Sequence, residues 1–400
     1  MLLSKQKIIT AYYYMALIAF ALSACAVMFD QESSDGIAYT NFIIAFAFMV
    51  WSIFVLRPFT KNYLIEIPSK TILFFNVYML WVLLVTTINP AGVEGVSSYI
   101  NSLFWSALPI LILNSTYYFV LHKGDSKWLK MTFLVITALF LLTYYSFYDV
   151  DNILMNVHLG SSYYSLYMLP LVLIYPSKIG KTCWTIIISL AVFSSVKRGG
   201  VLALALAMLA YIITNQLVSK QGKFTKIIIG FCVLTAFIAI FAYIGTMGDN
   251  NIFERFESIQ EDNGSGRTDV WNEAWRLINN QGVFTYFVGN GFNTVVHNSR
   301  YVLSAHNDYL EAWFDFGFIG MTLYIISLLL LFKDIFKCLK AKKEYAPAMS
   351  VLGVLVVVLT MISHIAIYYW FNVIVLCIAY FEGRYNREKR QLTKIDEDNE

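Results

Sequence analysis

The chain has 400 residues, of which 58% are hydrophobic and 14% are charged, and its formal net charge is +3. Soluble domains are usually about a quarter charged, so this composition excludes a soluble globular protein. Apolar runs of about 20 residues recur from end to end, which is typical of polytopic helical membrane proteins. We therefore expect one transmembrane domain over residues 1–400, without a second folded domain and without a nucleic-acid partner.

The apolar runs predict an all-α membrane protein with about 12 transmembrane helices. The N-terminal run contains Ser23–Ala26, which faintly resembles a signal-peptide cleavage site, but the many later spans favour a retained first helix. The expected spans are residues 8–28, 41–56, 71–89, 100–121, 131–148, 163–175, 182–196, 200–217, 226–245, 315–333, 347–363 and 366–382.

Lysine and arginine residues gather near the N-terminus, in every second loop and in the C-terminal tail, whereas the alternate loops are neutral or acidic. Cytoplasmic loops of membrane proteins carry the excess of basic residues, so we expect both termini in the cytoplasm. Two basic stretches fall on the outer side instead: Lys197-Arg198, and the long loop 246–314 with four arginines. Positive charge on the translocated side opposes the insertion preference, so a functional requirement should hold it there.

The loop 246–314 contains one predicted helix, over residues 268–278. Asn263–Gly266 is typical of a turn, and Thr268 or Asp269 could then cap the helix. The apolar face of this helix comprises Trp271, Ala274, Trp275 and Ile278, and we expect it to lie on the membrane surface. Further along, Gly289 and Gly291 indicate a tight turn.

The five cysteines are scattered and predict neither a disulfide framework nor a metal site. The sequence has no HExxH motif, no His/Cys cluster and no glycine-rich nucleotide-binding loop after a strand. We therefore expect no metal and no cofactor, and we expect arginines to hold any phosphate-bearing substrate.

Two arginines are candidates for binding an anion. Lys197-Arg198-Gly199-Gly200 interrupts an apolar run at the outer membrane face, and Arg198 offers planar donors that suit phosphate oxygens. Arg267 precedes the predicted helix, whose free N–H groups would also attract an anion. The alternatives are a helix-end turn with cations snorkelling to lipid headgroups, and a solvated loop arginine.

His306 is the outstanding titratable group, because it lies where the long loop enters an apolar helix. The neighbouring Asn307, Asp308 and Glu311 crowd it, and a carboxylate could fix its tautomer and raise its basicity. An imidazole that titrates near neutral pH suits a general base. The alternative is an interfacial histidine with satisfied hydrogen bonds.

Taken together, these residues resemble the motifs of the O-antigen ligase and O-antigen polymerase family. The matching stretches are Ser265-Gly266-Arg267 with Trp271, Gly289-x-Gly291-Phe292, and His306-Asn307 followed after nine residues by Gly317-x-x-Gly320. Lys197-Arg198-Gly199-Gly200 is similar to the family's Ser-Arg-Gly-Gly stretch, although no serine directly precedes Arg198. The resemblance covers roughly residues 185–332, and the rest of the chain agrees only in hydropathy.

The resemblance implies a GT-C-like helical fold with one large periplasmic loop, in the bacterial inner membrane. It implies metal-independent, inverting transfer of a glycan from undecaprenyl diphosphate at the periplasmic face. Arg198, Arg267 and Lys197 would bind the diphosphate, and His306 would be the base. Asn307, Asp308 and Glu311 would support His306, and the six motif glycines would serve turns and packing. These are Gly199, Gly200, Gly289, Gly291, Gly317 and Gly320.

Three functions fit the sequence to different degrees. A polymerase adds the growing chain to a new lipid-linked repeat unit and works with a chain-length regulator protein; a ligase transfers the polymer to lipid A–core. We favour the polymerase, because polymerases vary with the sugar they join and are more numerous. A flippase of lipid-linked oligosaccharide would share this composition. However, the chain shows no internal repeat, and its polar groups gather at one membrane face, which favours an enzyme.

Overall fold

The computed structural model describes residues 5–29, 68–89, 95–146, 162–195, 197–219, 266–363 and 369–399. All regular secondary structure within these ranges is helical, as the sequence predicted. The helices are α1 (Lys5–Phe29), α3 (Lys70–Ile88), α4 (Gly95–Lys123), α5 (Lys127–Ser146), α6 (Ser162–Leu173), α7 (Lys178–Ser194), α8 (Arg198–Val218), α11 (Arg267–Asn280), α12 (Val283–Val288), α13 (Thr294–Asn298), α14 (Asp308–Lys340), α15 (Ala346–Ile362) and α16 (Phe371–Asn399).

Six of the described helices are long and apolar enough to cross a membrane: α1, α3, α4, α5, α8 and α14. This confirms a polytopic helical membrane protein, whereas the number of about 12 spans stays a prediction. The expected spans 41–56 and 226–245, and loop residues 246–265, lie outside the described residues. The other expected spans each fall on a helix, but α14 begins at Asp308 instead of residue 315.

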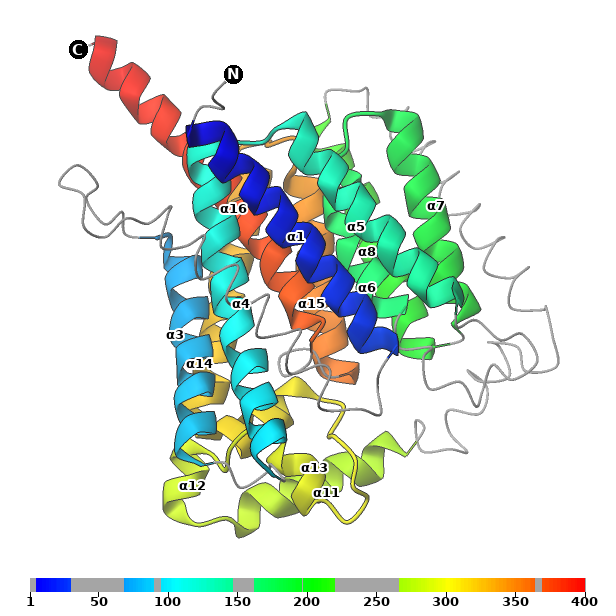
Figure 1. Cartoon of the computed structure of the whole chain (residues 1–400), viewed down its shortest axis with the longest axis vertical. Coiled ribbons are helices and arrows are strands. Elements are labelled where there is room, and N and C mark those ends of the chain that lie inside the picture. Colours follow the sequence, from blue (N-terminus) through cyan, green and yellow to red (C-terminus); the bar gives the residue numbers. More distant parts are fainter. Residues whose placement is uncertain are drawn as a thin grey trace.

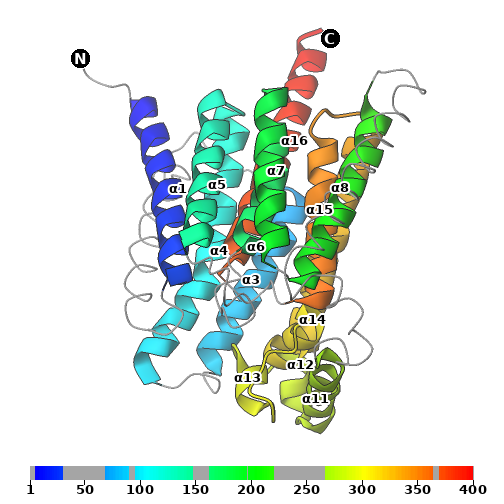
Figure 2. The same ribbon diagram turned by 90° about the vertical axis from the view of Figure 1, so that its right-hand side faces the viewer.

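The long helices stand side by side in a bundle, and α11, α12 and α13 form a layer across one end of it (Figures 1 and 2). Helix α1 begins, and α16 ends, at the opposite end of the bundle (Figure 1). The described part of the long loop and the two chain ends therefore lie at opposite ends of the molecule, as the alternation of basic and acidic loops predicts.

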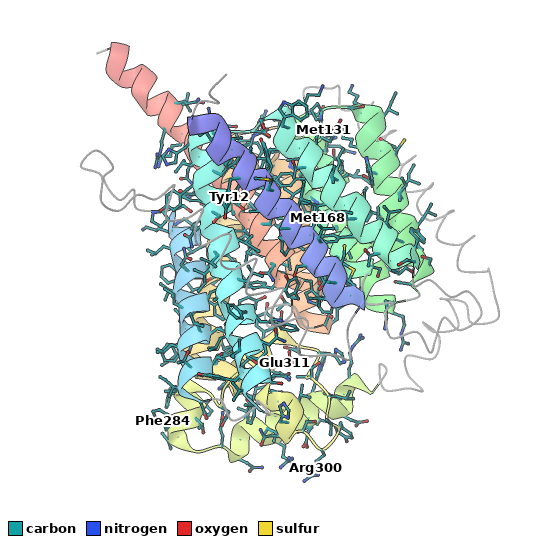
Figure 3. The ribbon with its side chains drawn as sticks, viewed as in Figure 1. Tyr12, Met131, Met168, Phe284, Arg300 and Glu311 are labelled. Atoms are coloured by element: carbon teal, nitrogen blue, oxygen red, sulfur yellow. The ribbon has the colours of Figure 1, made fainter. Side chains whose placement is uncertain are left out.

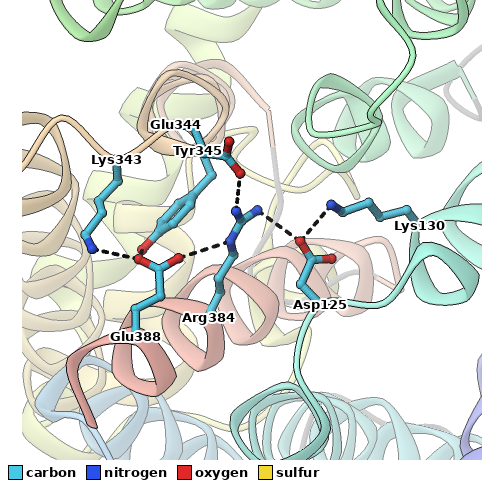
Figure 4. A network of polar contacts seen from close by, with 7 residues as sticks. All are labelled: Asp125, Lys130, Lys343, Glu344, Tyr345, Arg384 and Glu388. Carbon is cyan, nitrogen blue, oxygen red and sulfur yellow. Dashed lines mark hydrogen bonds and ion pairs between the residues drawn. The ribbon is translucent and has the colours of Figure 1, made fainter. Parts of the chain in front are cut away.

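A network of ion pairs ties the helices together at the end where the chain begins and finishes (Figure 4). Asp125, between α4 and α5, contacts the Nζ of Lys130 at 2.7 Å and the Nη1 of Arg384 at 3.1 Å. Arg384, on α16, also pairs with Glu344 and Glu388. Because Arg384 joins three separate segments, it fixes this end of α16 against the starts of α5 and α15.

Helix α14 consists of two helical segments joined by a kink at Gly317, where φ is 72° and ψ is 176°. A kink removes hydrogen bonds of the helix and so leaves carbonyl groups without their helical donors. Inside a membrane protein, other donors must satisfy these carbonyls. Gly291 N–H donates to the carbonyl of Asp315 at 2.9 Å, and Trp81 Nε1 on α3 donates to that of Phe316 at 2.8 Å. Asn290 donates to the carbonyl of Phe314 through both its backbone N–H and its side-chain amide. The kink is thus a built feature, and it directs residues 308–316 into the α11–α13 layer.

Candidate active site

Three helix ends meet beside His306: the start of α8, the end of α15 and the start of α14. A side chain at Gly199 would meet Ile362 of α15 at 3.1 Å and the hydroxyl of Tyr163 on α6 at 3.4 Å. The amide of Asn307 reaches the carbonyl of Met361 on α15 at 3.5 Å. The last turn of α15 therefore lies between the Gly199-Gly200 pair and the turn that carries His306. Gly199 therefore lies at a close approach of α8, α15 and α6.

His306 lies near two cations that are remote in sequence. Burial, Arg267 and Lys197, in that order, lower the pKa of His306 from its ordinary value to about 4. The expectation that a carboxylate would raise the basicity of His306 was wrong, because burial and, after it, the positive charges of Arg267 and Lys197 lower the pKa of the imidazole. His306 also has a φ of 49°, in the left-handed region that residues other than glycine rarely adopt.

The residues predicted to support His306 shape its turn. Asn307 is the N-cap of α14, and its side-chain oxygen accepts from the N–H groups of Tyr309 and Leu310 at 3.0 and 3.2 Å. Asn307 is thus placed by a specific local interaction, which fixes where the helix begins and hence where His306 lies.

The two carboxylates lie below this turn, inside the protein. Glu311 is buried, and its Oε1 accepts from the backbone N–H of Ala305 at 2.8 Å (Figure 3 shows Glu311 between the bundle and the end layer). Asp308 is also buried, and the hydroxyl of Tyr324 donates to its Oδ2 at 3.4 Å. Glu311 therefore holds the turn from beneath.

Arg267 is the first residue of α11, one residue earlier than predicted. Gly266 is the N-cap, with a φ of 72°, and Lys197 is the N-cap of α8. The N-cap residues Lys197 and Gly266 give no side-chain cap, and the prediction that Thr268 or Asp269 caps α11 was wrong, because Gly266 occupies the N-cap position. The first N–H groups of a helix bind anions when no side chain takes them. Arg267 and Lys197 each stand at a helix start, where the positive end of the helix dipole favours a nearby anion.

The apolar face of α11 was predicted correctly, but not its partner. Ala274 and Ile278 are buried in a cluster with Leu310 and Phe314 of α14, whereas Trp275 is 43% exposed. The face thus covers the first segment of α14 instead of lying on the membrane.

Polar contacts also hold α11 in place. Both carboxylate oxygens of Glu273, on this helix, accept from Arg276, and the backbone N–H of Arg300 donates to Glu273 at 3.1 Å. The contact with Arg300 ties α11 to the loop that leads to His306.

The other predicted residues fall into two groups. Arg198, 8% exposed, opens α8 directly after Lys197. Gly289, Gly291, Gly317 and Gly320 surround the kink in α14 and are required by close approaches there.

Sequence reasoning missed the partners of these glycines. Tyr163 packs on Gly199 and Gly200, and Trp81 packs on Gly320. Asp315 accepts from Thr294 Oγ1 at 2.7 Å and from the Val295 N–H at 2.9 Å, and so holds the start of α13. An aspartate inside an apolar run was a signal that could have found Asp315. Tyr163 and Trp81 lie among many similar aromatic residues and gave none.

Comparison with known proteins gives one family match. Residues 183–325 match the family model Wzy_C, described as O-antigen ligase. This range includes Lys197, Arg267 and His306, together with both helix starts described above. A comparison with curated proteins gives no match. The match agrees with the family that the motifs indicated, because residues 183–325 of the chain are similar to the O-antigen ligase family model.

Proposed function

We propose that the protein transfers a glycan from a polyprenyl-diphosphate carrier to an acceptor hydroxyl, with His306 as the general base. The observation that carries this proposal is the convergence of His306, Arg267 and Lys197 from three separate segments. In the proposed reaction, His306 takes the proton of the acceptor hydroxyl while that oxygen attacks the anomeric carbon. The bond from this carbon to the diphosphate oxygen breaks, the diphosphate leaves with the electron pair, and the configuration inverts.

The low pKa of His306 is compatible with this role. A group with a pKa of about 4 is neutral at pH 7 and so is ready to accept a proton, although it is a weaker base than an ordinary imidazole. A diphosphate bound beside Arg267 and Lys197 would offset their charge and raise the pKa of His306. The substrate would then strengthen the base that acts on it.

Lys197, Arg198 and Arg267 would stabilise the leaving diphosphate. Its negative charge grows as the glycosidic bond breaks, and cations already in position stabilise that charge without reorganisation. The starts of α8 and α11 add the positive ends of two helix dipoles. These positive groups would bind the phosphate oxygens directly, so the proposed reaction uses no metal ion.

The proposed acceptor is a new lipid-linked repeat unit, so that the enzyme polymerises O-antigen or a related surface polysaccharide. The site would then face the periplasm, with both termini in the cytoplasm, and a chain-length regulator would be a further partner. Transfer to lipid A–core is the second candidate, because the matching family model is described as O-antigen ligase.

The lipopolysaccharide banding pattern of a deletion strain tests the choice of acceptor. Core carrying a single repeat unit is the result expected for a loss of polymerase. Bare core with accumulated lipid-linked polymer would identify a ligase instead. Complementation with the wild-type chain should restore the ladder, whereas complementation with His306→Gln should not. In vitro, purified enzyme should extend a lipid-diphosphate glycan with a chelator present.

A further inference from the structure

Helix α12 presents an apolar edge to the outside of the protein. The exposed fractions of Val283, Phe284 and Phe287 are 78%, 69% and 46%. Figure 3 shows Phe284 at the outer margin of the α11–α13 layer, whereas Arg300 points away from the bundle on the underside of that layer. The layer therefore has an apolar edge, and the charged Arg300 stands on its underside.

This edge continues directly onto the apolar exterior of α14. The ring of Phe287 lies edge-on to that of Phe318, with 6.3 Å between the ring centroids, and Tyr286 stacks on the same Phe318 ring at 6.4 Å. Phe318 and Ile319 are 39% and 38% exposed and follow the kink, where the apolar membrane-spanning segment of α14 begins. No boundary of polar side chains separates α12 from this segment at Phe287 and Phe318.

Aromatic residues surround the junction. Trp313 contacts Trp275, Tyr286 and Phe318, with ring centroids 5.5, 5.5 and 5.8 Å apart. Trp81 also reaches this level, because its indole N–H donates to the carbonyl of Phe316. Tryptophan and tyrosine are enriched where a membrane protein passes through the headgroup region, since their rings are apolar and carry a polar group.

We propose that α12 is an interfacial anchor, with Val283, Phe284 and Phe287 inserted at the boundary between the lipid headgroups and acyl chains. The lipid bilayer is the occupant that fits, because the edge is continuous with an apolar surface of a membrane-spanning helix. Apolar side chains of interfacial segments insert at this boundary while the polar parts of the protein beside them stay in water. Large contiguous apolar patches are rare on surfaces that face water.

The anchor would set the height of the active site. The turn that follows α12 packs on the kink of α14, and the first segment of α14 begins two residues after His306. A fixed depth for α12 would thus hold His306 and Arg267 close to the headgroup level. This consequence rests on the proposed function, since the diphosphate of a lipid carrier lies at that level; the anchoring itself does not.

Site-directed spin labelling tests the anchor without measuring activity. A label at Phe284→Cys is compared with one at Arg300→Cys, in protein whose native cysteines are replaced by alanine and which is reconstituted in bilayers. At position 284, collisions with dissolved oxygen, which concentrates in lipid, should exceed collisions with a water-soluble nickel chelate several-fold. At position 300, the order should reverse. Gel filtration establishes that each labelled variant is folded.

Two results would overturn the proposal. Equal exposure of positions 284 and 300 to the nickel chelate would place α12 in water. Protection of position 284 from both reagents would show that protein, instead of lipid, covers the edge.

A separate activity assay with Phe284→Asp tests the consequence for catalysis. Asn279→Asp, at an exposed position of α11, is the matched control for added charge. Lipid contact at position 284 with an inactive wild-type enzyme would leave the anchor standing and contradict only the proposed function.

Discussion

Gly289 and Gly317 lie backbone against backbone. A Cβ at Gly289 would stand 2.6 Å from the nitrogen of Gly317, and a Cβ at Gly317 would stand 2.6 Å from the carbonyl carbon of Val288. Both residues also have positive φ angles, of 102° and 72°. The spacing between these two motif glycines therefore reflects one contact: the turn after α12 supplies the donors that the kink in α14 requires.

Alanine at Gly289 or Gly317 should destabilise the protein strongly. Both residues lie in a φ/ψ region that is essentially confined to glycine, where a residue with a Cβ costs roughly 1–3 kcal/mol. Overpacking against immovable backbone costs roughly a further 1–3 kcal/mol. Thermal unfolding of the detergent-solubilised variants should show a clear loss. Gly282→Ala is the matched control, because a Cβ there meets only Thr285 Oγ1, at 3.8 Å. An unchanged melting temperature for Gly317→Ala would contradict the close contact.

Asn307 should tolerate serine better than alanine. Serine is also a good N-cap, whereas loss of a capping side chain costs about 1 kcal/mol. We therefore expect Asn307→Ser to keep most of the activity and Asn307→Ala to lose stability and activity together, measured by thermal unfolding and by glycan transfer. If serine were as inactive as alanine in a fully stable protein, Asn307 would have to contact the substrate itself.

The sequence predicted the long helices and the elements that meet at the site, because hydrophobic periodicity and glycine spacing are local signals. It could not predict the electrostatic environment of His306. The neighbours that matter there, Arg267 and Lys197, come from α11 and α8, while the sequence neighbours Asp308 and Glu311 turn inward. The carboxylates next to His306 in the sequence were therefore a poor guide to the pKa of its imidazole.

The α11–α13 layer gives a second example of what the sequence could not predict. The amphipathic pattern of α11 correctly predicted a buried face, but periodicity does not say whether lipid or protein covers it. Ala274 and Ile278 pack on α14, and the exposed apolar edge belongs to the six-residue α12, which is too short to give a periodic signal. Only tertiary packing distinguishes these two surfaces.

Lysine should replace Arg267 poorly. Arginine presents a planar fork to phosphate oxygens, and the lysine ammonium keeps the charge without that geometry. One lost charge-assisted contact is worth about 1.5–3 kcal/mol, or roughly ten- to hundred-fold in rate. We expect Arg267→Lys to be nearly as damaging as Arg267→Ala in a transfer assay, with Arg300→Lys as a control on the exposed underside. Full activity of stably expressed Arg267→Ala would remove this residue from the site.

Labelling in intact cells should place the two ends of the bundle on opposite sides of the membrane. Arg300 lies in the α11–α13 layer and Lys340 at the far end of α14, and both are exposed. With the native cysteines replaced, a membrane-impermeant thiol reagent should modify Arg300→Cys in intact cells. It should modify Lys340→Cys only after permeabilisation. The reverse pattern would place the candidate site in the cytoplasm and contradict the basic-loop orientation.

The pH dependence of transfer should reveal His306 and its cationic neighbours. The acid limb of kcat/KM reports the base in the free enzyme, so its midpoint should lie near pH 4, the pKa of His306. The acid limb of kcat reports the substrate complex, in which the diphosphate offsets Arg267 and Lys197, and its midpoint should lie higher. Lys197→Met removes a positive charge that disfavours the protonated imidazole. The pKa of His306 should therefore rise, on the order of half a pH unit, and activity should be lost earlier as the pH falls. Lys340→Met, at the other end of the bundle, should leave the profile unchanged.

His306 itself should be required for the chemical step. A positioned base contributes about 10²–10⁴-fold to the rate, and glutamine can donate a hydrogen bond but cannot take up the proton. We therefore expect His306→Gln and His306→Ala to be equally inactive in glycan transfer while keeping membrane insertion and binding of the lipid-diphosphate donor. If His306→Gln kept most of the activity, the imidazole would serve as a hydrogen-bonding residue only. The proton would then have to pass to Asp308 or Glu311, the buried carboxylates below the turn, and Asp308→Asn or Glu311→Gln would abolish transfer in its place.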